Sequence, residues 1–247
     1  MKKELLILVL ILSVLGGCKK DNKEPPKSTL TGVVVVTGTK TPVGVASNGT
    51  QLEIWQSGYQ LFQKIAVYID QDGTFSSKLY DGQYKLVRLS GAPWANATDT
   101  IVVNLKGSAT VEVPVMPFFT TAGETYTYKA SDTSITAVFS VNRLDATKNA
   151  DKVSFHIALT NFVDAQTNQI PIPAATNDIA PAGTYLTAPT TIKILLNPDR
   201  YPGTANAELR RQLSQALLKG YGFVRVGVRT TGVTQRYYTQ VKEVALK

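Results

Sequence analysis

Short apolar segments separated by turn-forming residues are the feature that most constrains this fold. Residues 33–36 are consecutive valines, a β-branched run typical of a buried strand. Residues 51–55 and 65–69 place their apolar side chains at alternate positions, as a strand with one buried face does. Asp72-Gly73 and Asp81-Gly82 are strong turn signals between such segments. The predicted strands of this first block cover residues 31–38, 51–55, 65–69, 83–87, 101–103 and 109–115.

A second block of predicted strands follows a junction at Met116-Pro117. Its strands again alternate or form short apolar runs, so the chain as a whole is predicted to be all β. The last two segments are expected to pair as a hairpin across residues 230–234. The predicted strands of the second block cover residues 135–141, 153–159, 192–196, 221–229 and 235–244.

Residues 206–219 predict one short α-helix near the C-terminus. Apolar side chains recur on one helical face from Leu209 to Leu217. Asn206 is the predicted N-cap and Gly220 the predicted stop. Because the apolar stripe is narrow, the helix is expected to cover one end of a β-sandwich.

The first residues form a different kind of segment. Lys2 and Lys3 precede an apolar run that ends at Leu15, which is shorter than the roughly twenty residues that a membrane-spanning helix needs. Residues 1–17 are therefore predicted to be a cleaved signal peptide. Leu15-Gly16-Gly17-Cys18 resembles the lipobox of bacterial lipoproteins, which implies that Cys18 is lipidated and becomes the mature N-terminus. The alternative is an ordinary secretory signal followed by an incidental cysteine.

Cys18 is the only cysteine of the chain, so no internal disulfide can form, and lipidation explains why it stands alone. Acyl chains on this residue would hold the protein at a membrane without a spanning helix. Residues 18–27 are polar, charged and proline-bearing, and are predicted to be a lipidated tether. The charged residues resemble Bacteroidetes sorting signals, which implies an outer-membrane lipoprotein at the cell surface or the periplasmic face.

Four segments of the first block together resemble a known fold. They are residues 30–34, 72–75, 79–84 and 111–115, and they are similar to the transthyretin-like, carboxypeptidase-regulatory-type β-sandwich. With the lipobox in front, the chain resembles the domain-of-unknown-function 3823 family of Bacteroidetes lipoproteins. The resemblance implies two tandem β-sandwich domains, a transthyretin-like one at residues 28–117 and an immunoglobulin- or fibronectin-like one at residues 118–247. It also implies a gene of the kind commonly encoded near starch-utilisation-type outer-membrane transporters, and no established chemistry.

The charge pattern argues against nucleic acid as a partner. The formal net charge is +8, but the basic residues are scattered and form no single stripe of the kind that replaces counterions on phosphates. The densest basic segments are the tether and Arg210-Arg211. Contact with lipopolysaccharide or anionic glycans accounts for the charge more simply.

Side chains for common enzyme chemistries are missing from the sequence. His156 is the only histidine, and it has no nucleophile motif to accompany it as a catalytic triad requires. One histidine and one lipidated cysteine cannot form a zinc site. Asp70 and Asp72 are a weak calcium candidate that a hairpin turn explains equally well. Glu53 and other strand glutamates are expected to face solvent. We therefore predict no catalytic residue, no metal and no cofactor, with an unrecognised carboxylate site as the remaining enzymatic alternative.

Aromatic residues provide the positive case for a function. Sugars stack their C–H faces on aromatic rings and hydrogen-bond to nearby amides and carboxylates. Trp55 shares a strand face with Glu53, Tyr59 follows in a polar loop, and Trp94 lies in another loop. These three aromatic residues are the predicted ligand-binding residues, with core or interdomain packing as the alternative for each.

Two hypotheses follow from the sequence. In the first, the chain is a non-catalytic lipoprotein that captures a polysaccharide or oligosaccharide for a starch-utilisation-like uptake system. In the second, it is a structural or interaction subunit that contacts an outer-membrane transporter or another lipoprotein and binds no sugar.

Overall fold

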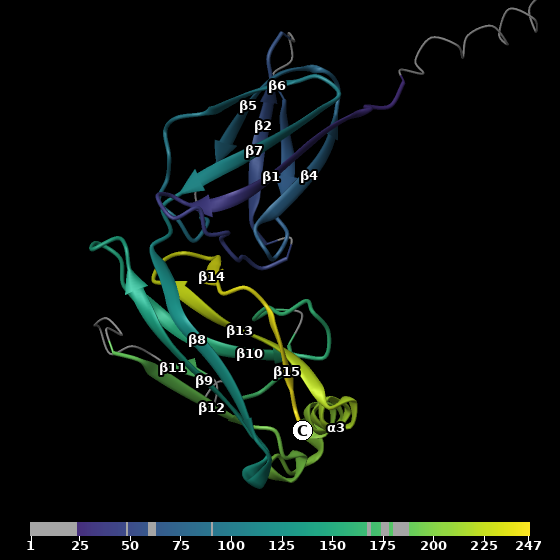
Figure 1. The fold of residues 1–247 in the computed structure, drawn as a ribbon, viewed down its shortest axis with the longest axis vertical. Helices are drawn as coiled ribbons and strands as arrows, with labels where there is room; N and C mark the ends of the chain where they lie inside the picture. Colours follow the sequence, from purple (N-terminus) through teal and green to yellow (C-terminus); the bar gives the residue numbers. More distant parts are fainter. Residues whose placement is uncertain are drawn as a thin grey trace, which may run out of the picture.

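The computed structural model describes residues 24–47, 49–58, 63–89, 91–166, 169–173, 178–179 and 188–247. Two β-rich units lie end to end along the long axis of the molecule (Figure 1). The predicted signal peptide, Cys18, Tyr59 and most of the predicted tether lie outside the described residues.

Strands β1 to β7 form the first unit, which is the upper one in Figure 1. One of its sheets has the strand order β4-β1-β7 and the other β3-β2-β5-β6. β1 pairs antiparallel with β4 and parallel with β7. The strands are β1 (Ser28–Val36), β2 (Gln51–Gln56), β3 (Lys64–Tyr68), β4 (Thr74–Leu79), β5 (Gly82–Arg88), β6 (Ile101–Leu105) and β7 (Ser108–Val115).

The second unit also has two sheets. One has the order β12-β9-β8, and the other has the order β11-β10-β13-β14 with β15 also paired to β13. Its elements are β8 (Phe119–Lys129), η2 (Ala130–Asp132), β9 (Ser134–Arg143), β10 (Ala150–Ala158), β11 (Asp178–Ile179), β12 (Thr190–Leu195), η3 (Pro198–Arg200), η4 (Thr204–Asn206), α3 (Ala207–Lys219), β13 (Tyr221–Thr230), β14 (Arg236–Tyr238) and β15 (Lys242–Ala245). The predicted fold class, tandem β-sandwiches with one short helix, is confirmed.

The α3 helix packs at the end of the second unit that lies away from the first (Figure 1). Its predicted stop is confirmed, because Gly220 has a left-handed backbone with φ 75° and its N–H donates to Ala216 and Leu217 carbonyls. Asn206 occupies the predicted N-cap position of α3, but its side chain makes no capping hydrogen bond. Its Nδ2 donates to the carbonyl of Pro202 at 2.9 Å instead, because the η4 turn runs directly into α3 and leaves Asn206 inside a helical turn.

Alternation along the strands decides which side chains enter the core. Leu52 and Ile54 of β2 are fully buried. Because neighbouring strand residues point to opposite faces, Gln51, Glu53 and Trp55 lie on the other face of the β3-β2-β5-β6 sheet.

Apolar packing is continuous from one unit into the other. A single cluster of buried side chains contains residues from both sandwiches. Val43 and Val45, from the segment after β1, are fully buried at this junction, and Phe118 and Phe119 at the start of the second unit are also buried. Separating the two units would expose this apolar surface to water.

Arg225 of β13 is the polar centre of the junction. It is 0% exposed, and its Nη2 donates to the carbonyl oxygen of Val45 in the first unit at 3.0 Å. Its Nη1 lies 3.5 Å from the carbonyl oxygen of Gln71. The guanidinium also lies 3.8 Å from the ring centroid of Tyr238. Burial lowers the pKa of Arg225 to about 10, so the group is still protonated at neutral pH.

Close backbone contact fixes the same junction from a second point. The N–H of Tyr238 donates to the carbonyl of Gly44 at 2.9 Å, forming an isolated β-bridge between the units. A Cβ atom on Gly44 would lie 2.4 Å from the carbonyl oxygen of Tyr238. Gly44 therefore allows an approach of the two backbones that a larger residue would prevent.

We expect Arg225→Ala to lower the free energy of unfolding by about 2–4 kcal/mol, because it leaves a cavity and removes the charged donor to a buried carbonyl. Urea unfolding of the two proteins measures the change. Arg211→Ala is the control, since Arg211 is exposed on α3 and its loss should not move the midpoint. An unchanged midpoint in Arg225→Ala would contradict this role.

Candidate functional site

The outward face of the β3-β2-β5-β6 sheet forms an open platform. Trp55 of β2 lies directly opposite Lys64 of β3 and Lys85 of β5 in the strand register. We call this surface the outer sheet face. By strand register and alternation it comprises Gln51, Glu53, Trp55, Lys64, Ala66, Tyr68, Gln83, Lys85, Val87, Val102 and Asn104.

Two aromatic residues lie on the outer sheet face. Trp55 is partly exposed, and Tyr68 is 55% exposed. Tyr68 is paired with Gln51, four residues before Trp55 on the adjacent strand, so the two aromatics are about 13 Å apart along the strand direction. Tyr68 was not among the aromatics predicted from the sequence. The sequence feature that could have identified Tyr68 is its position between Val67 and Ile69. Strand alternation directs those two side chains into the core and Tyr68 to the opposite face.

Hydrogen-bonding groups surround these rings. Glu53 accepts a hydrogen bond from Lys64 Nζ at 2.7 Å, and Gln83 Nε2 donates to Asn104 Oδ1 at 3.1 Å. The expected exposure of Glu53 is wrong, since the residue is only 8% exposed. It belongs to a central strand and has paired neighbours on both β3 and β5.

Trp94 does not lie on this platform. It is 1% exposed and belongs to the core, where it forms an isolated β-bridge with Pro117 at the start of the second unit. The prediction that Trp94 is an exposed loop aromatic is therefore wrong. The backbone at Trp94 pairs with the segment between the two units, and this pairing places the indole in the core. The burial leaves no ring face for a sugar.

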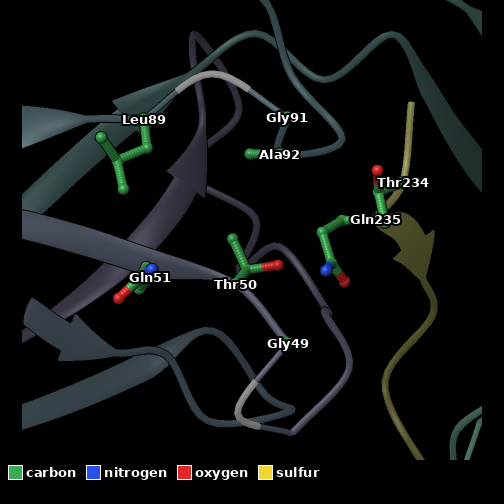
Figure 2. A pocket seen from close by; sticks show the side chains of 8 residues that line it. All are labelled: Gly49, Thr50, Gln51, Leu89, Gly91, Ala92, Thr234 and Gln235. Carbon is green, nitrogen blue, oxygen red and sulfur yellow. The ribbon is translucent and has the colours of Figure 1, made fainter. Parts of the chain in front are cut away.

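A groove at the domain junction continues the outer sheet face. Its cavity has a volume of about 290 Å³, and Gln51 belongs both to this cavity and to the platform. Figure 2 shows Thr234 and Gln235 of the second unit facing Thr50 and Ala92 of the first across the cavity. We call this the junction groove. It is lined by Gly49, Thr50, Gln51, Leu89, Gly91, Ala92, Thr234 and Gln235.

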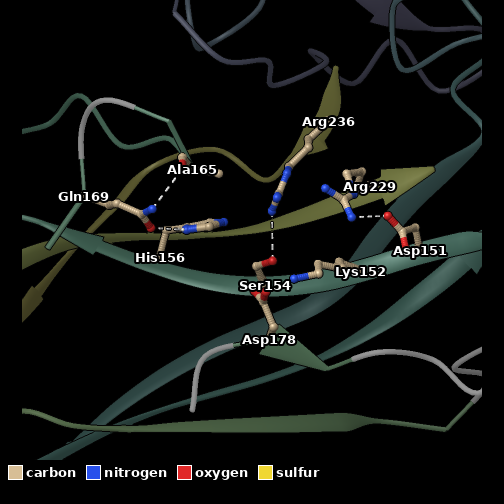
Figure 3. A network of polar contacts seen from close by, with 9 residues as sticks. All are labelled: Asp151, Lys152, Ser154, His156, Ala165, Gln169, Asp178, Arg229 and Arg236. Atoms are coloured by element: carbon tan, nitrogen blue, oxygen red, sulfur yellow. Dashed lines mark hydrogen bonds and ion pairs between the residues drawn. The ribbon is translucent and has the colours of Figure 1, made fainter. Parts of the chain in front are cut away.

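His156 lies in a polar network on the second unit (Figure 3). Its Nδ1 is 2.7 Å from Gln169 Oε1, and Gln169 Nε2 donates to the carbonyl of Ala165 at 2.9 Å. The Gln169 oxygen must therefore accept, which makes Nδ1 the protonated nitrogen. The His156 side chain is 2% exposed, so the imidazole is buried.

Burial lowers the pKa of His156 to about 4, whereas the pKa of an unfolded histidine is about 6.5. Below pH 6.5 the unfolded chain takes up a proton that the folded protein does not, so stability falls as pH is lowered through this range. We expect the free energy of unfolding to fall by about 2 kcal/mol between pH 7 and pH 5, measured by urea unfolding at each pH.

The matched variant is His156→Gln, which removes the only histidine of the chain. It should abolish most of this pH dependence, because carboxyl groups titrate mainly at lower pH. A wild-type stability that is flat from pH 7 to pH 5 would show that the folded protein also binds the proton.

The described residues offer neither a cluster of metal ligands nor a membrane-spanning helix. These residues contain no group of three or more His, Cys, Asp or Glu side chains that could hold a metal ion. Asp72 Oδ1 accepts hydrogen bonds from the backbone N–H and the hydroxyl of Thr74 at 3.0 and 2.7 Å, a local turn contact. No helix within the same residues is long and apolar enough to cross a membrane.

Comparison with known families agrees with this architecture. The family model described as "Protein of unknown function (DUF3823) N-terminal domain" matches residues 28–116, and "Domain of unknown function (DUF3823_C)" matches residues 124–243. The chain belongs to the DUF3823 family. The family resemblance predicted from the sequence is thereby confirmed.

Solved structures show the same DUF3823 fold. A DUF3823 family protein from Bacteroides ovatus is 30% identical, with a TM-score of 0.72 over 90% of this chain and 100% of that one. A Bacteroides uniformis protein, provisionally described as carbohydrate binding, is 15% identical, with a TM-score of 0.70 over 89% of this chain and 99% of that one. At that identity the second likeness shows the fold alone.

A curated relative matches only part of this DUF3823 chain. The probable exo-1,4-beta-xylosidase xlnD of Aspergillus japonicus is 31% identical over 118 residues. The match covers 46% of this chain but 14% of the fungal protein.

Proposed function

We propose that this DUF3823 protein is a non-catalytic glycan-binding protein that uses the outer sheet face and the junction groove. The observation that carries the proposal is the placement of Trp55 and Tyr68 on adjacent strands of one open face. Both are large rings with a polar group, a type of side chain suited to stacking against an amphipathic sugar. Their separation favours an extended saccharide over a single sugar ring.

The polar residues of the site complement these rings. Gln51, Gln83 and Asn104 present amides on the outer sheet face. Amides both donate and accept hydrogen bonds, as sugar hydroxyls do. From Gln51 the polar surface continues into the junction groove, where Thr234 and Gln235 add further groups. A glycan chain lying along the strands would thus meet hydrogen-bonding groups over its length.

Descriptions of related proteins support a carbohydrate ligand. The Bacteroides uniformis protein of the same fold carries a provisional carbohydrate-binding description, and the partial fungal match is to a xylosidase.

The cellular setting is part of the same proposal. Residues 1–17 act as a signal peptide and residues 18–27 as a tether lipidated at Cys18. The domains at 28–117 and 118–247 are thereby held at the outer membrane, where the protein assists a starch-utilisation-like uptake system. Such a position places a binding surface where polysaccharides arrive.

We expect Trp55→Ala and Tyr68→Ala each to weaken glycan binding about fivefold to tenfold, since stacking contacts of this kind contribute roughly 1 kcal/mol. Affinity electrophoresis against plant, host and microbial polysaccharides identifies a ligand and measures the loss. Tyr80→Ala is the matched control, because Tyr80 is 44% exposed but lies outside the outer sheet face.

The opposite result has a defined meaning. If the wild-type protein is retarded by no polysaccharide, or if Tyr80→Ala weakens binding as much as Tyr68→Ala, the outer sheet face is not a glycan site. The interaction-subunit hypothesis then takes precedence, and co-purification from membranes tests it by identifying a transporter or lipoprotein bound to the chain.

The lipid anchor has its own test. We expect Cys18→Ser to move the protein from the membrane fraction to the soluble fraction of cells, because the hydroxyl cannot receive the thioether-linked lipid. Incorporation of labelled palmitate into the wild type but not the variant checks the chemistry. Retention of the variant in the membrane fraction would contradict anchoring through Cys18.

A further inference from the structure

A second cavity extends the junction groove onto the second unit. Its volume is about 240 Å³, and it shares Thr234 and Gln235 with the junction groove. We call it the arginine pocket. It is lined by Ala46, Ala165, Gln166, Arg229, Thr234, Gln235, Arg236 and Tyr238.

Two arginines of this pocket face each other across the hairpin. Arg229 of β13 is directly paired with Arg236 of β14, and Figure 3 shows both guanidinium groups on the same side of the sheet. Like charges placed directly opposite each other in an antiparallel pair repel and destabilise it. An anion between or beside them would relieve that repulsion.

The nearby carboxylates already have partners. Asp151 forms an ion pair with Arg229, and Asp178 forms an ion pair with Lys152 at 2.8 Å. Arg236 donates from Nη1 to the neutral hydroxyl of Ser154 at 2.9 Å. Asp178 also interacts electrostatically with Arg236 and is hydrogen-bonded to the same Ser154. Two carboxylates, Asp151 and Asp178, thus face the three cations Lys152, Arg229 and Arg236, and this cluster keeps a net positive charge.

The charged residues beneath the arginine pocket do not offset its net positive charge. Tyr238, one of the lining residues, stacks on the buried guanidinium of Arg225 at 3.8 Å. Asp164 interacts electrostatically with Arg225, and its Oδ1 accepts a hydrogen bond from the N–H of Gln166 at 2.7 Å. Asp164 therefore offsets the charge of Arg225, and the two residues together add no net charge beneath the pocket.

We propose that the arginine pocket binds the carboxylate of a uronic acid, so that the glycan of this protein is an acidic one. The planar guanidinium of Arg236 matches a carboxylate with two parallel hydrogen bonds. Gln166, Thr234 and Gln235 supply neutral donors and acceptors for the hydroxyls of the same sugar. The inference rests on the proposed function, because the pocket continues the groove that leads from Trp55.

The size of the pocket agrees with this ligand. A volume of about 240 Å³ is smaller than the roughly 300–1,000 Å³ of sites for drug-sized molecules. One sugar residue fits such a space, with the rest of the chain in the junction groove and on the outer sheet face.

The test compares an oligogalacturonate with its methyl ester, which has the same sugar ring but no charge. Isothermal titration of the wild-type protein should show at least tenfold tighter binding of the acid. Arg236→Gln should reduce this preference to near parity, whereas Trp55→Ala should weaken both ligands. The control is Arg200→Gln, which removes the same charge from the exposed η3 turn and should keep the preference.

The outcomes separate the two proposals. Equal binding of the acid and the ester, both weakened by Trp55→Ala, would keep the glycan site and overturn the arginine pocket. An acid preference lost equally in Arg200→Gln would also overturn the pocket, because net charge alone would then explain it.

If neither oligosaccharide binds, the pocket is judged by NMR. Titration with galacturonate and with glucuronate should shift the side-chain Nε–H resonance of Arg236 in a saturable way. Such a shift would retain the carboxylate pocket even where the glycan site on the outer sheet face has failed. An unshifted resonance with both sugars would overturn the pocket.

Discussion

The buried guanidinium of Arg225 is the interaction on which the arrangement of this molecule depends. A charged group without solvent must recover the hydrogen bonds it lost, and here it does so from a carbonyl of the other unit. The two sandwiches are consequently held in one relative orientation by this directional contact and by the Gly44–Tyr238 bridge, together with the shared apolar core. The junction groove exists only in that orientation, because its two walls come from different units.

Local sequence patterns were sufficient to predict most of the strands. Alternation identifies β2 and β3 because Leu52, Ile54 and Val67 recur every second residue and all enter the core. The Asp72-Gly73 turn follows from a glycine with positive φ and an aspartate that accepts from the residues after it. The helix stop at Gly220 is equally local. Each of these features depends on neighbours within a few residues, which is the range that a single sequence reveals.

Contacts between distant residues account for what could not be predicted. Arg225 and Val45 are 180 residues apart, and nothing near either position indicates the other. Trp94 is in a loop, where there is no periodicity to distinguish a buried ring from an exposed one. The burial of Glu53 depends on its neighbours on β3 and β5. Trp55 and Tyr68, by contrast, could be placed together once the strand register was known.

The direction of β1 has a consequence for how the molecule is presented. The strand runs from Ser28 toward the junction, and the segment after it meets the second unit where Gln240 Nε2 lies 3.4 Å from the carbonyl of Pro42. Residues 24–27 therefore leave the first unit at its side, away from the second unit (Figure 1). Attachment through the N-terminus would therefore place the first unit nearer to the point of attachment than α3, which lies at the far end of the second unit.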